Sequence, residues 1–210
     1  MTATAPQIVQ LGENAFDDVV AVLCAAFHDY PVMRYILKES AGDYDAQLTE
    51  LIGYFTDSRV SRSWPVLGAL LDGKLVAAAN INPPRSAPQP PSLKKRYERL
   101  HDRLGPAAMA RFEAFADAAK PFTPDEPHYY LGMLGVRPEC RGRRLARYLL
   151  DALHDMSARD PDSTGVFLTT EDPRNLTLYE RFGYRVVGRG QAEELVTWGM
   201  FRPDPPPGRA

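Results

Sequence analysis

The most informative stretch of the sequence is HYYLGMLGVRPECRGRRLARY, residues 128–148. It combines an apolar strand, a turn at residues 137–139, a glycine-containing loop and the start of an amphipathic helix. The first N–H groups of a helix lack partners within it, and the helix dipole favours negative charge beside them. Four arginines gather at this point: Arg141, Arg143, Arg144 and Arg147. We therefore expect a phosphate or pyrophosphate site there, with a basic, solvated helix start as the alternative.

A second strand–turn–helix unit follows in TGVFLTTEDPRNLTLYERFGY, residues 164–184. Asp172 is a good helix cap, and Pro173 suits the first helical position. Asn175 and Tyr179 are four residues apart, so they share one face of this helix. The alternative for Tyr179 is a core aromatic ring with a solvated hydroxyl.

Together the two segments resemble the acyl-CoA-binding half of the GNAT superfamily of N-acetyltransferases. Residues 141–146, RGRRLA, are similar to the family's Arg/Gln-x-x-Gly-x-Gly/Ala loop, with Arg144 where glycine is usual. A non-glycine residue is tolerable there if the backbone is already helical, although an arginine could crowd the pyrophosphate. The second segment is similar to the family's closing Asn-x-x-x-Tyr-x-x-x-Gly-Phe/Tyr signature. The spacing fits neither a Walker P-loop nor a GxGxxG dinucleotide loop.

The resemblance implies acetyl-CoA as co-substrate and no metal. In the family, Asn175 would bind the pantetheine arm and Tyr179 would protonate the leaving thiolate. A phenol with an ordinary pKa of about 10 is well matched to that role. The cofactor-binding residues that the resemblance implies are Leu134, Gly135, Val136, Arg141, Gly142, Arg143, Arg144, Leu145, Ala146, Asn175 and Tyr179.

The group that deprotonates the amine stays open at this point. Many relatives carry a Glu or His at the strand position of Gly132, which has no side chain. His128 and Tyr130 share a strand face with Gly132, so either could act through water. Glu171 is the other candidate, because the subgroup of puromycin N-acetyltransferase, which this chain also resembles, tends to carry Glu at the position of Thr169, two residues earlier. The alternatives are a helix-dipole partner for Glu171 and a surface position for His128.

Further short matches resemble the subgroup of puromycin N-acetyltransferase and its relatives. They cover residues 25–31, 126–131, 173–176 and 197–200. This resemblance implies transfer of an acetyl group from acetyl-CoA to the amine of a small, amphipathic molecule. The alternatives are a non-catalytic acyl-CoA or small-molecule binding module, and an acyltransferase with another acyl donor or an oxygen acceptor.

The acceptor pocket is expected to be aromatic and mildly polar, which favours a small amphipathic amine over a polycationic acceptor. The expected pocket residues are Phe27, Tyr30, Met33, Tyr54, Trp64, Tyr130 and Trp198.

Composition limits the other function classes. The chain has 210 residues and a net charge of −2, which argues against a nucleic-acid partner. The N-terminal residues lack a signal layout, and no apolar run reaches membrane-spanning length, which favours a cytoplasmic protein without a membrane partner. Two cysteines outside any CxxC pair and four scattered histidines form no metal-binding pattern. A monomer and a homodimer both remain open.

One domain is expected over residues 1–202, with a proline-rich loop at 82–92 and a disordered tail at 203–210. The family implies a mixed α/β (α+β) fold, in which helices flank a largely antiparallel central sheet. One parallel pair, residues 128–137 and 165–170, is expected to splay and admit the pantetheine. The other expected strands are 7–11, 65–71, 74–82, 184–188 and 194–201. The expected helices include one capped by Asn14 and others at 32–39, 43–61, 92–104 and 107–120.

Overall fold

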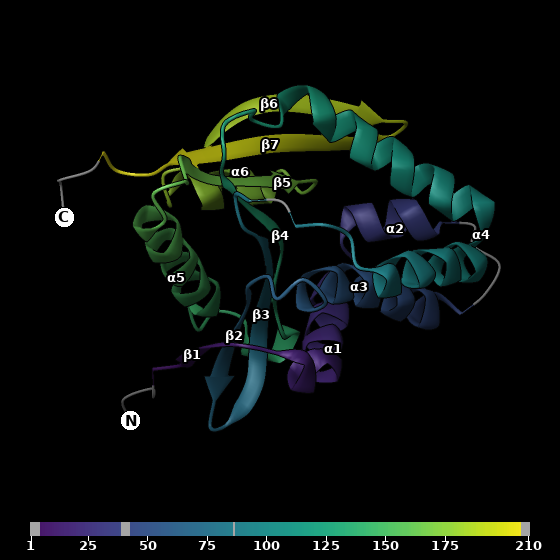
Figure 1. Ribbon diagram of the computed structural model, residues 1–210, viewed down its shortest axis with the longest axis horizontal. Coiled ribbons are helices and arrows are strands. Elements are labelled where there is room, and N and C mark those ends of the chain that lie inside the picture. Colours follow the sequence, from purple (N-terminus) through teal and green to yellow (C-terminus); the bar gives the residue numbers. More distant parts are fainter. Residues whose placement is uncertain (1–4, 39–42, 86, 207–210) are drawn as a thin grey trace.

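The computed structural model of the chain describes residues 5–38, 43–85 and 87–206 (Figure 1). The helices are α1 (Phe16–Phe27), α2 (Pro31–Leu37), α3 (Tyr44–Val60), α4 (Pro91–Ala119), α5 (Leu145–Arg159) and α6 (Arg174–Glu180). The strands are β1 (Gln7–Gln10), β2 (Val66–Leu71), β3 (Lys74–Asn82), β4 (Tyr129–Val136), β5 (Gly165–Thr170), β6 (Arg185–Ala192) and β7 (Leu195–Pro203).

All seven strands form one sheet in the order β1-β2-β3-β4-β5-β7-β6. Every neighbouring pair is antiparallel except β4 and β5, which run parallel. The predicted mixed α/β fold, with a largely antiparallel sheet and one parallel pair, is therefore confirmed. The parallel pair is short, because only residues 129–131 of β4 face residues 166–168 of β5. The remaining five residues of β4 have no strand partner on that side among the residues that the structure describes.

β4 contains a bulge at Gly132. In the ladder with β3, Asn80 pairs with Met133 while Ile81 pairs with Leu131, so Gly132 is the extra residue. A bulge bends a strand and increases its local twist. β4 therefore turns at the point where its pairing with β5 ends.

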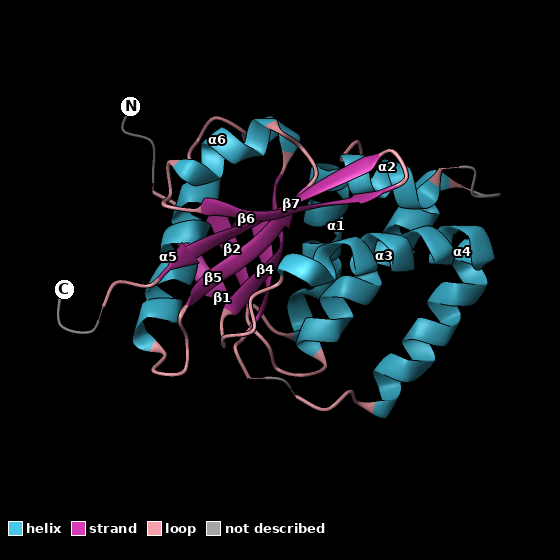
Figure 2. Cartoon of the chain, turned by 90° about the horizontal axis from the view of Figure 1, so that it is seen from above, coloured by secondary structure: helices cyan, strands magenta, loops and turns pink. Residues whose placement is uncertain are grey.

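The helices cover both faces of the sheet. Figure 2 shows α5 on one side and α1, α2, α3 and α4 on the other. Small residues in β3 allow a close approach from both sides: Ala77 and Ala79 belong to the core under α5, and Ala78 belongs to the core under α1. Strand alternation explains this division, since neighbouring side chains point to opposite faces.

Some elements differ from the expectations. The prediction that Asn14 caps the first helix is wrong, because a 3₁₀ turn at Glu13–Ala15 leads into α1, which begins at Phe16 without a side-chain cap. The helices expected at 92–104 and 107–120 form α4, which is broken at Gly105 (φ 77°, ψ 167°).

The ordered chain extends past residue 202. β7 ends at Pro203, the Asp204 carboxylate accepts a hydrogen bond from Ser157 (2.6 Å), and the Asp204 N–H donates to the Thr164 carbonyl (3.0 Å). Residues 207–210 of the expected tail, and residue 39 of the expected second helix, lie outside the described residues.

No single helix in the described part of the chain is both long and apolar enough to cross a membrane. Only Glu13–Phe27 and Pro31–Leu37, taken as one pair bent by 96°, have the length and composition to do so. Most apolar residues of this pair, including Val22, Leu23 and Ile36, are buried in the core.

Gly135 should be intolerant of a side chain, because α1 approaches β4 closely there. A Cβ at this position would lie 2.7 Å from Ala26 Cβ and 3.0 Å from Leu23 Cδ2. We expect Gly135→Ala to destabilise the protein by about 1–3 kcal/mol and to lower Tm by roughly 2–10 °C in thermal unfolding. Gly12→Ala is the control, since the nearest atom to its Cβ, Asn14 Oδ1, would be 3.6 Å away. Equal Tm values for the two variants would contradict this account of α1 packing.

Candidate active site

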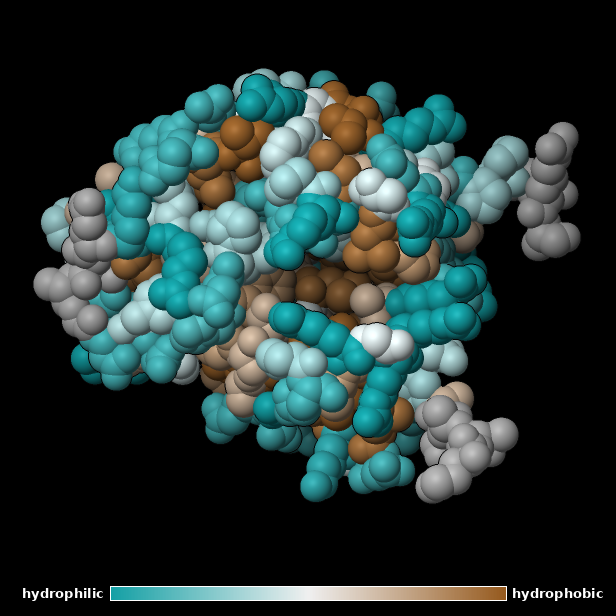
Figure 3. All heavy atoms as spheres, turned by 180° about the vertical axis from the view of Figure 1, so that it is seen from behind, coloured by the Kyte–Doolittle hydropathy of each residue, from teal (hydrophilic) through white to brown (hydrophobic). Residues whose placement is uncertain are grey.

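A cavity of about 1060 Å³ lies where β4 and β5 separate. Its walls come from α1, α2, α3, α4 and α6 and from the last residues of β4 and β5. Figure 3 shows a hollow near the middle of one face, with hydrophobic (brown) atoms at its floor and hydrophilic (teal) atoms around its rim. The cavity is large enough to hold parts of two ligands side by side.

The end of β4 forms one wall of this cavity. Leu134, Gly135 and Val136 all line it, and they belong to the part of β4 that has no partner on the β5 side. Backbone groups that point away from β3 here are free to pair with an extended ligand.

The loop after β4 leads to the start of α5. Arg141, Gly142, Arg143 and Arg144 are exposed, and Arg141 and Ala146 line the cavity. Arg141, Arg143 and Arg144 have no carboxylate partner among the described residues, whereas Arg147 pairs with Asp151 at 3.4 Å. Three unpaired cations beside the free N–H groups of a helix start make a site suited to phosphate.

The backbone of this loop is not what the sequence suggested. The condition under which a non-glycine residue is tolerable, a helical backbone, is not met: Arg144 is left-handed (φ 60°, ψ 18°) and precedes Leu145, the first residue of α5. Gly142 also has a positive φ of 80°. Two left-handed residues turn the chain sharply into the helix, and only one of them is the glycine that this conformation favours.

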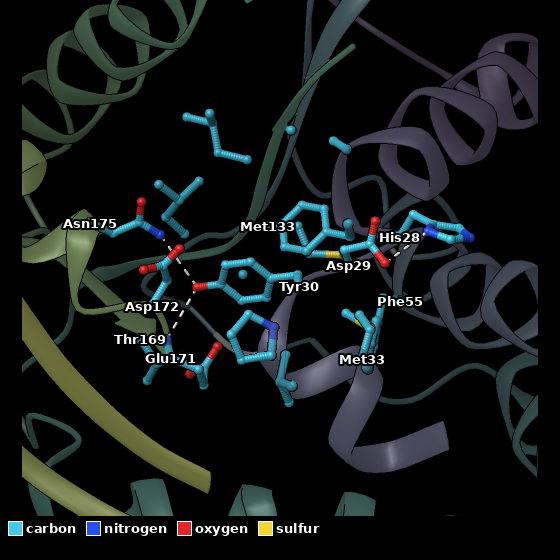
Figure 4. Close-up of a pocket in the computed structure, with 18 of the residues that line it drawn as sticks. His28, Asp29, Tyr30, Met33, Phe55, Met133, Thr169, Glu171, Asp172 and Asn175 are labelled. Atoms are coloured by element: carbon cyan, nitrogen blue, oxygen red, sulfur yellow. Dashed lines mark hydrogen bonds and ion pairs between the residues drawn. The ribbon is translucent and has the colours of Figure 1, made fainter. Parts of the chain in front are cut away.

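The Tyr30 hydroxyl connects the α1–α2 turn to the end of β5. It accepts a hydrogen bond from the Glu171 N–H (3.1 Å) and shares one with Thr170 Oγ1 (2.9 Å). The Asn175 amide donates to both of these oxygens, at 3.5 Å and 3.1 Å respectively. Figure 4 shows Tyr30 reaching between Asn175 and Glu171. Burial raises the pKa of Tyr30 well above its ordinary value, so the hydroxyl stays protonated and acts as a link.

Glu171 follows β5 directly and lines the cavity, although only 7% of the residue is exposed. Burial raises the pKa of its carboxyl to about 7, and the hydrogen bond from Thr197 opposes this rise. Thr197 Oγ1, buried in β7, donates to Glu171 Oε1 at 2.8 Å and holds the carboxyl in place. A carboxyl that titrates near neutral pH can accept a proton and release it again.

Tyr179 lies on α6 and lines the same cavity. Burial raises the pKa of its hydroxyl to about 12, and the negative charge of Glu171 adds to the rise. No described residue forms a hydrogen bond with this hydroxyl, and its ring packs edge-on against Tyr184. Tyr179 is therefore a protonated donor without a protein acceptor. Asn175, one turn earlier, lines the same wall.

The other two base candidates have different surroundings. Tyr130 lines the cavity, and its hydroxyl shares a hydrogen bond with Thr169 Oγ1 (3.3 Å). His128 is not among the cavity residues; its ring packs edge-on against Phe167 and Phe201, and its Nδ1 bonds the Glu126 carbonyl at 2.7 Å.

The predicted acceptor residues divide into two groups. Phe27, Tyr30, Met33 and Tyr130 line the cavity. The other three lie elsewhere: Tyr54 packs against Tyr97, Trp64 lies under the Arg62 guanidinium, and Trp198 pairs with Thr170 across the β5–β7 ladder.

The cavity is also lined by residues that the sequence did not single out as site residues, among them Phe55, Arg59, Phe112 and Phe115. The spacing of Phe112 and Phe115 along the helix is that of core residues. Met109 on the same helix is indeed buried, at 2% exposure, but the phenylalanines are only half-buried. Within the described ranges, no group of three His, Cys, Asp or Glu side chains is placed to hold a metal ion.

The fold is shared with several solved acetyltransferase structures. A Corynebacterium glutamicum protein described as a histone acetyltransferase and related acetyltransferase superposes with a TM-score of 0.72, at 20% identity over 98% of this chain and 100% of that chain. A mosquito arylalkylamine N-acetyltransferase-like protein gives 0.60, at 13% identity over 95% and 100% of the two chains. Drosophila melanogaster polyamine N-acetyltransferase, which forms N-acetylagmatine, gives 0.56, at 18% identity over 93% and 98%.

At these identities the structural likeness shows the fold alone. The family is shown by the sequence, since the model of the acetyltransferase (GNAT) family matches residues 25–184. This match includes the cavity walls from α1 to α6, the loop before α5 and the Asn175–Tyr179 pair. The chain belongs to the GNAT family of acetyltransferases.

Proposed function

We propose that this protein transfers the acetyl group of acetyl-CoA to the amine of a small molecule. Membership of the acetyltransferase family supports acyl transfer in general. The observation that carries the finer proposal is the pairing of Glu171 with Tyr179 in one cavity. One is a carboxyl with a pKa of about 7, and the other is a phenol that stays protonated up to about pH 12.

The residues present fit an acyl-CoA. The unpartnered edge of β4 offers N–H and C=O groups to the amides of a pantetheine chain. The exposed arginines and the start of α5 offer donors to a pyrophosphate. We assign the pantetheine to Leu134, Gly135, Val136 and Asn175. We assign the phosphates to the loop at residues 141–146.

Acetyl-CoA supplies the reactive thioester, and the chain supplies the proton transfers. Glu171 accepts the proton that the acceptor nitrogen loses as its lone pair forms the C–N bond. Backbone N–H groups of β4 stabilise the negative charge on the carbonyl oxygen. As the C–S bond breaks, the Tyr179 hydroxyl donates its proton to sulfur. The proton held by Glu171 then restores Tyr179 through solvent, so that one proton moves from nitrogen to sulfur.

Glu171 is the base that the surroundings favour. His128 lies outside the cavity residues, and burial raises the pKa of the Tyr130 hydroxyl above its ordinary value, which makes it a poor base near neutral pH. We assign Tyr130 to the acceptor wall instead, with Phe27, Tyr30 and Met33.

Thiol release tests the proposed reaction. Acetyl-CoA is incubated with the protein and a panel of amines that includes 2-phenylethylamine, agmatine, phenylalanine and puromycin, the last because of the sequence resemblance. We expect thiol release with at least one amine. Tyr179→Phe should lower turnover about a hundredfold or more and leave the acetyl-CoA Kd from calorimetry within about twofold, since a general acid acts only in the reaction.

Tyr148→Phe is the matched control, because Tyr148 is 39% exposed on α5 and lies outside the cavity residues. Acetyl-CoA binding without thiol release on any amine would favour a non-catalytic binding module. Full turnover in Tyr179→Phe would remove Tyr179 from the reaction.

The pH dependence of turnover should report Glu171. A base must be deprotonated to work, so its contribution is present above its raised pKa of about 7 and is lost as the pH falls below that value. The quantity to measure is the ratio of kcat/KM for the wild type to that for Glu171→Gln. The titration of the acceptor amine affects both values equally and so cancels in this ratio. We expect this ratio to rise about tenfold per pH unit below about pH 7 and to level off above it.

Asp172→Asn is the control for the pH experiment. Asp172 also lines the cavity, but its hydrogen bonds to Arg174 hold the pKa of its carboxyl below the ordinary value. Asp172 stays charged from pH 5 upward, so the ratio of kcat/KM for the wild type to that for Asp172→Asn should not change with pH. A flat ratio for Glu171→Gln as well would exclude Glu171 as the base.

Arg141 should contribute to acetyl-CoA affinity. It is exposed, lines the cavity and has no carboxylate partner among the described residues. We expect Arg141→Ala to raise the acetyl-CoA Kd about five- to thirtyfold at low salt, with a smaller effect at 0.5 M salt because exposed charges are screened. Arg159→Ala, at the other end of α5, should have no effect. An equal effect of both variants would point to net charge rather than a phosphate site.

A further inference from the structure

Arg59 is a buried cation that the proposed transfer of acetyl does not use. It lies in the last turn of α3, is 8% exposed and lines the cavity. Its Nη1 donates to the Phe55 carbonyl (2.9 Å) and to Ser58 Oγ (2.8 Å). Its Nε is buried without a hydrogen-bond partner. No carboxylate in the described part of the chain lies within ion-pair distance of the guanidinium.

A buried charge without a counterion is unfavourable, so such groups are normally paired. The hydrogen bonds from Nη1 to carbonyl and hydroxyl oxygens at the end of α3 provide partners for one side of the guanidinium. They provide none for the other side, which carries Nε and Nη2. Burial lowers the pKa of Arg59 to about 10, which leaves the side chain charged at neutral pH.

Gly132 makes room for this side of Arg59. A Cβ at position 132 would lie 2.6 Å from Arg59 Nη2, closer than such atoms approach. The guanidinium therefore rests against the β4 bulge, at a strand position where many relatives carry a catalytic Glu or His. The space that a side chain at Gly132 would occupy is thus taken by the Arg59 guanidinium of α3.

The surroundings of Arg59 indicate what it binds. The neighbouring walls are apolar and aromatic: Phe55, Phe112 and Phe115. The negative charge of Glu171 and the positive charge of Arg59 both act on the Tyr130 hydroxyl, in opposite directions. The cavity thus carries both a carboxyl and a guanidinium among its lining groups.

We propose that Arg59 binds a carboxylate of the acceptor, so that the acceptor is a small amine with a carboxylate and an apolar body. This inference rests on the proposed transfer for the role of the amine. The unused Nε and Nη2 groups present the paired donors that suit a carboxylate. A single guanidinium favours a group with one negative charge over a phosphate. Glu171 then serves the amine.

The first test measures binding without turnover. Acetate and acetamide form one probe pair, and 3-phenylpropanoate and 3-phenylpropanamide form a second. We expect the wild type to bind the carboxylate of each pair at least about tenfold more tightly in calorimetry or ligand-observed NMR, and Arg59→Met to abolish the difference. Arg62→Met is the matched control, because Arg62 stacks on Trp64 and lies outside the cavity residues. Arg59→Lys keeps the charge without the paired donors and should retain part of the preference, provided that thermal unfolding shows each variant folded.

The second test measures turnover with phenylalanine and 2-phenylethylamine, which differ by the carboxylate. We expect the wild type to have a higher kcat/KM for phenylalanine than for 2-phenylethylamine. In Arg59→Met we expect this order to reverse, mainly because of changes in KM. Thiol release without a carboxylate preference, or a preference that survives in Arg59→Met, would overturn the assignment of Arg59 and leave the transferase standing. Carboxylate binding that depends on Arg59, without thiol release from any amine, would keep the anion site and overturn the proposed function.

Discussion

The site depends on the early end of pairing between β4 and β5. The two strands pair over residues 129–131 and 166–168, and the bulge at Gly132 then turns β4 away. Hydrogen bonds from strand to strand would otherwise continue and close the gap, leaving no free backbone edge for a ligand. The Tyr30 hydroxyl fixes the other rim, because it joins the α1–α2 turn to the Glu171 N–H and Thr170. The cavity therefore begins at a gap in the sheet, and the surrounding helices and connecting segments complete its walls.

Burial sets the chemistry on both sides of this gap. Desolvation raises the pKa of Glu171 to about 7 and that of Tyr179 to about 12, which separates a proton acceptor from a proton donor. The same desolvation makes the charge of Arg59 unfavourable until an anion pairs with it. Two of these groups are held by hydrogen bonds from or to neighbours: Thr197 positions Glu171, and Ser58 with the Phe55 carbonyl positions Arg59. The cavity thus has fixed polar groups in apolar walls, which is the usual arrangement for recognition of small molecules.

The elements of the two signature segments were predictable because these segments carry their information locally, whereas the fold was inferred from their resemblance to the GNAT family. Apolar strand, turn chemistry and helical spacing sufficed for β4, α5, β5 and α6. Long-range relations were not predictable, since no local pattern shows that Arg59 of α3 rests against Gly132. The left-handed backbone at Arg144 was missed for a related reason: arginine gives no signal for a positive φ. Helical periodicity marked Phe112 and Phe115 as inward-facing but could not separate a core from a cavity wall.

Backbone amide hydrogen exchange with and without acetyl-CoA tests the central claim most directly, because that claim concerns a free strand edge. We predict slower exchange on acetyl-CoA binding for residues 132–136 of β4 and 141–146 of the following loop. The outer edges of β1 and β6, which also lack a neighbouring strand among the described residues, should exchange at unchanged rates. Unchanged exchange throughout β4, with acetyl-CoA demonstrably bound, would contradict the assignment of this gap as the acyl-CoA site.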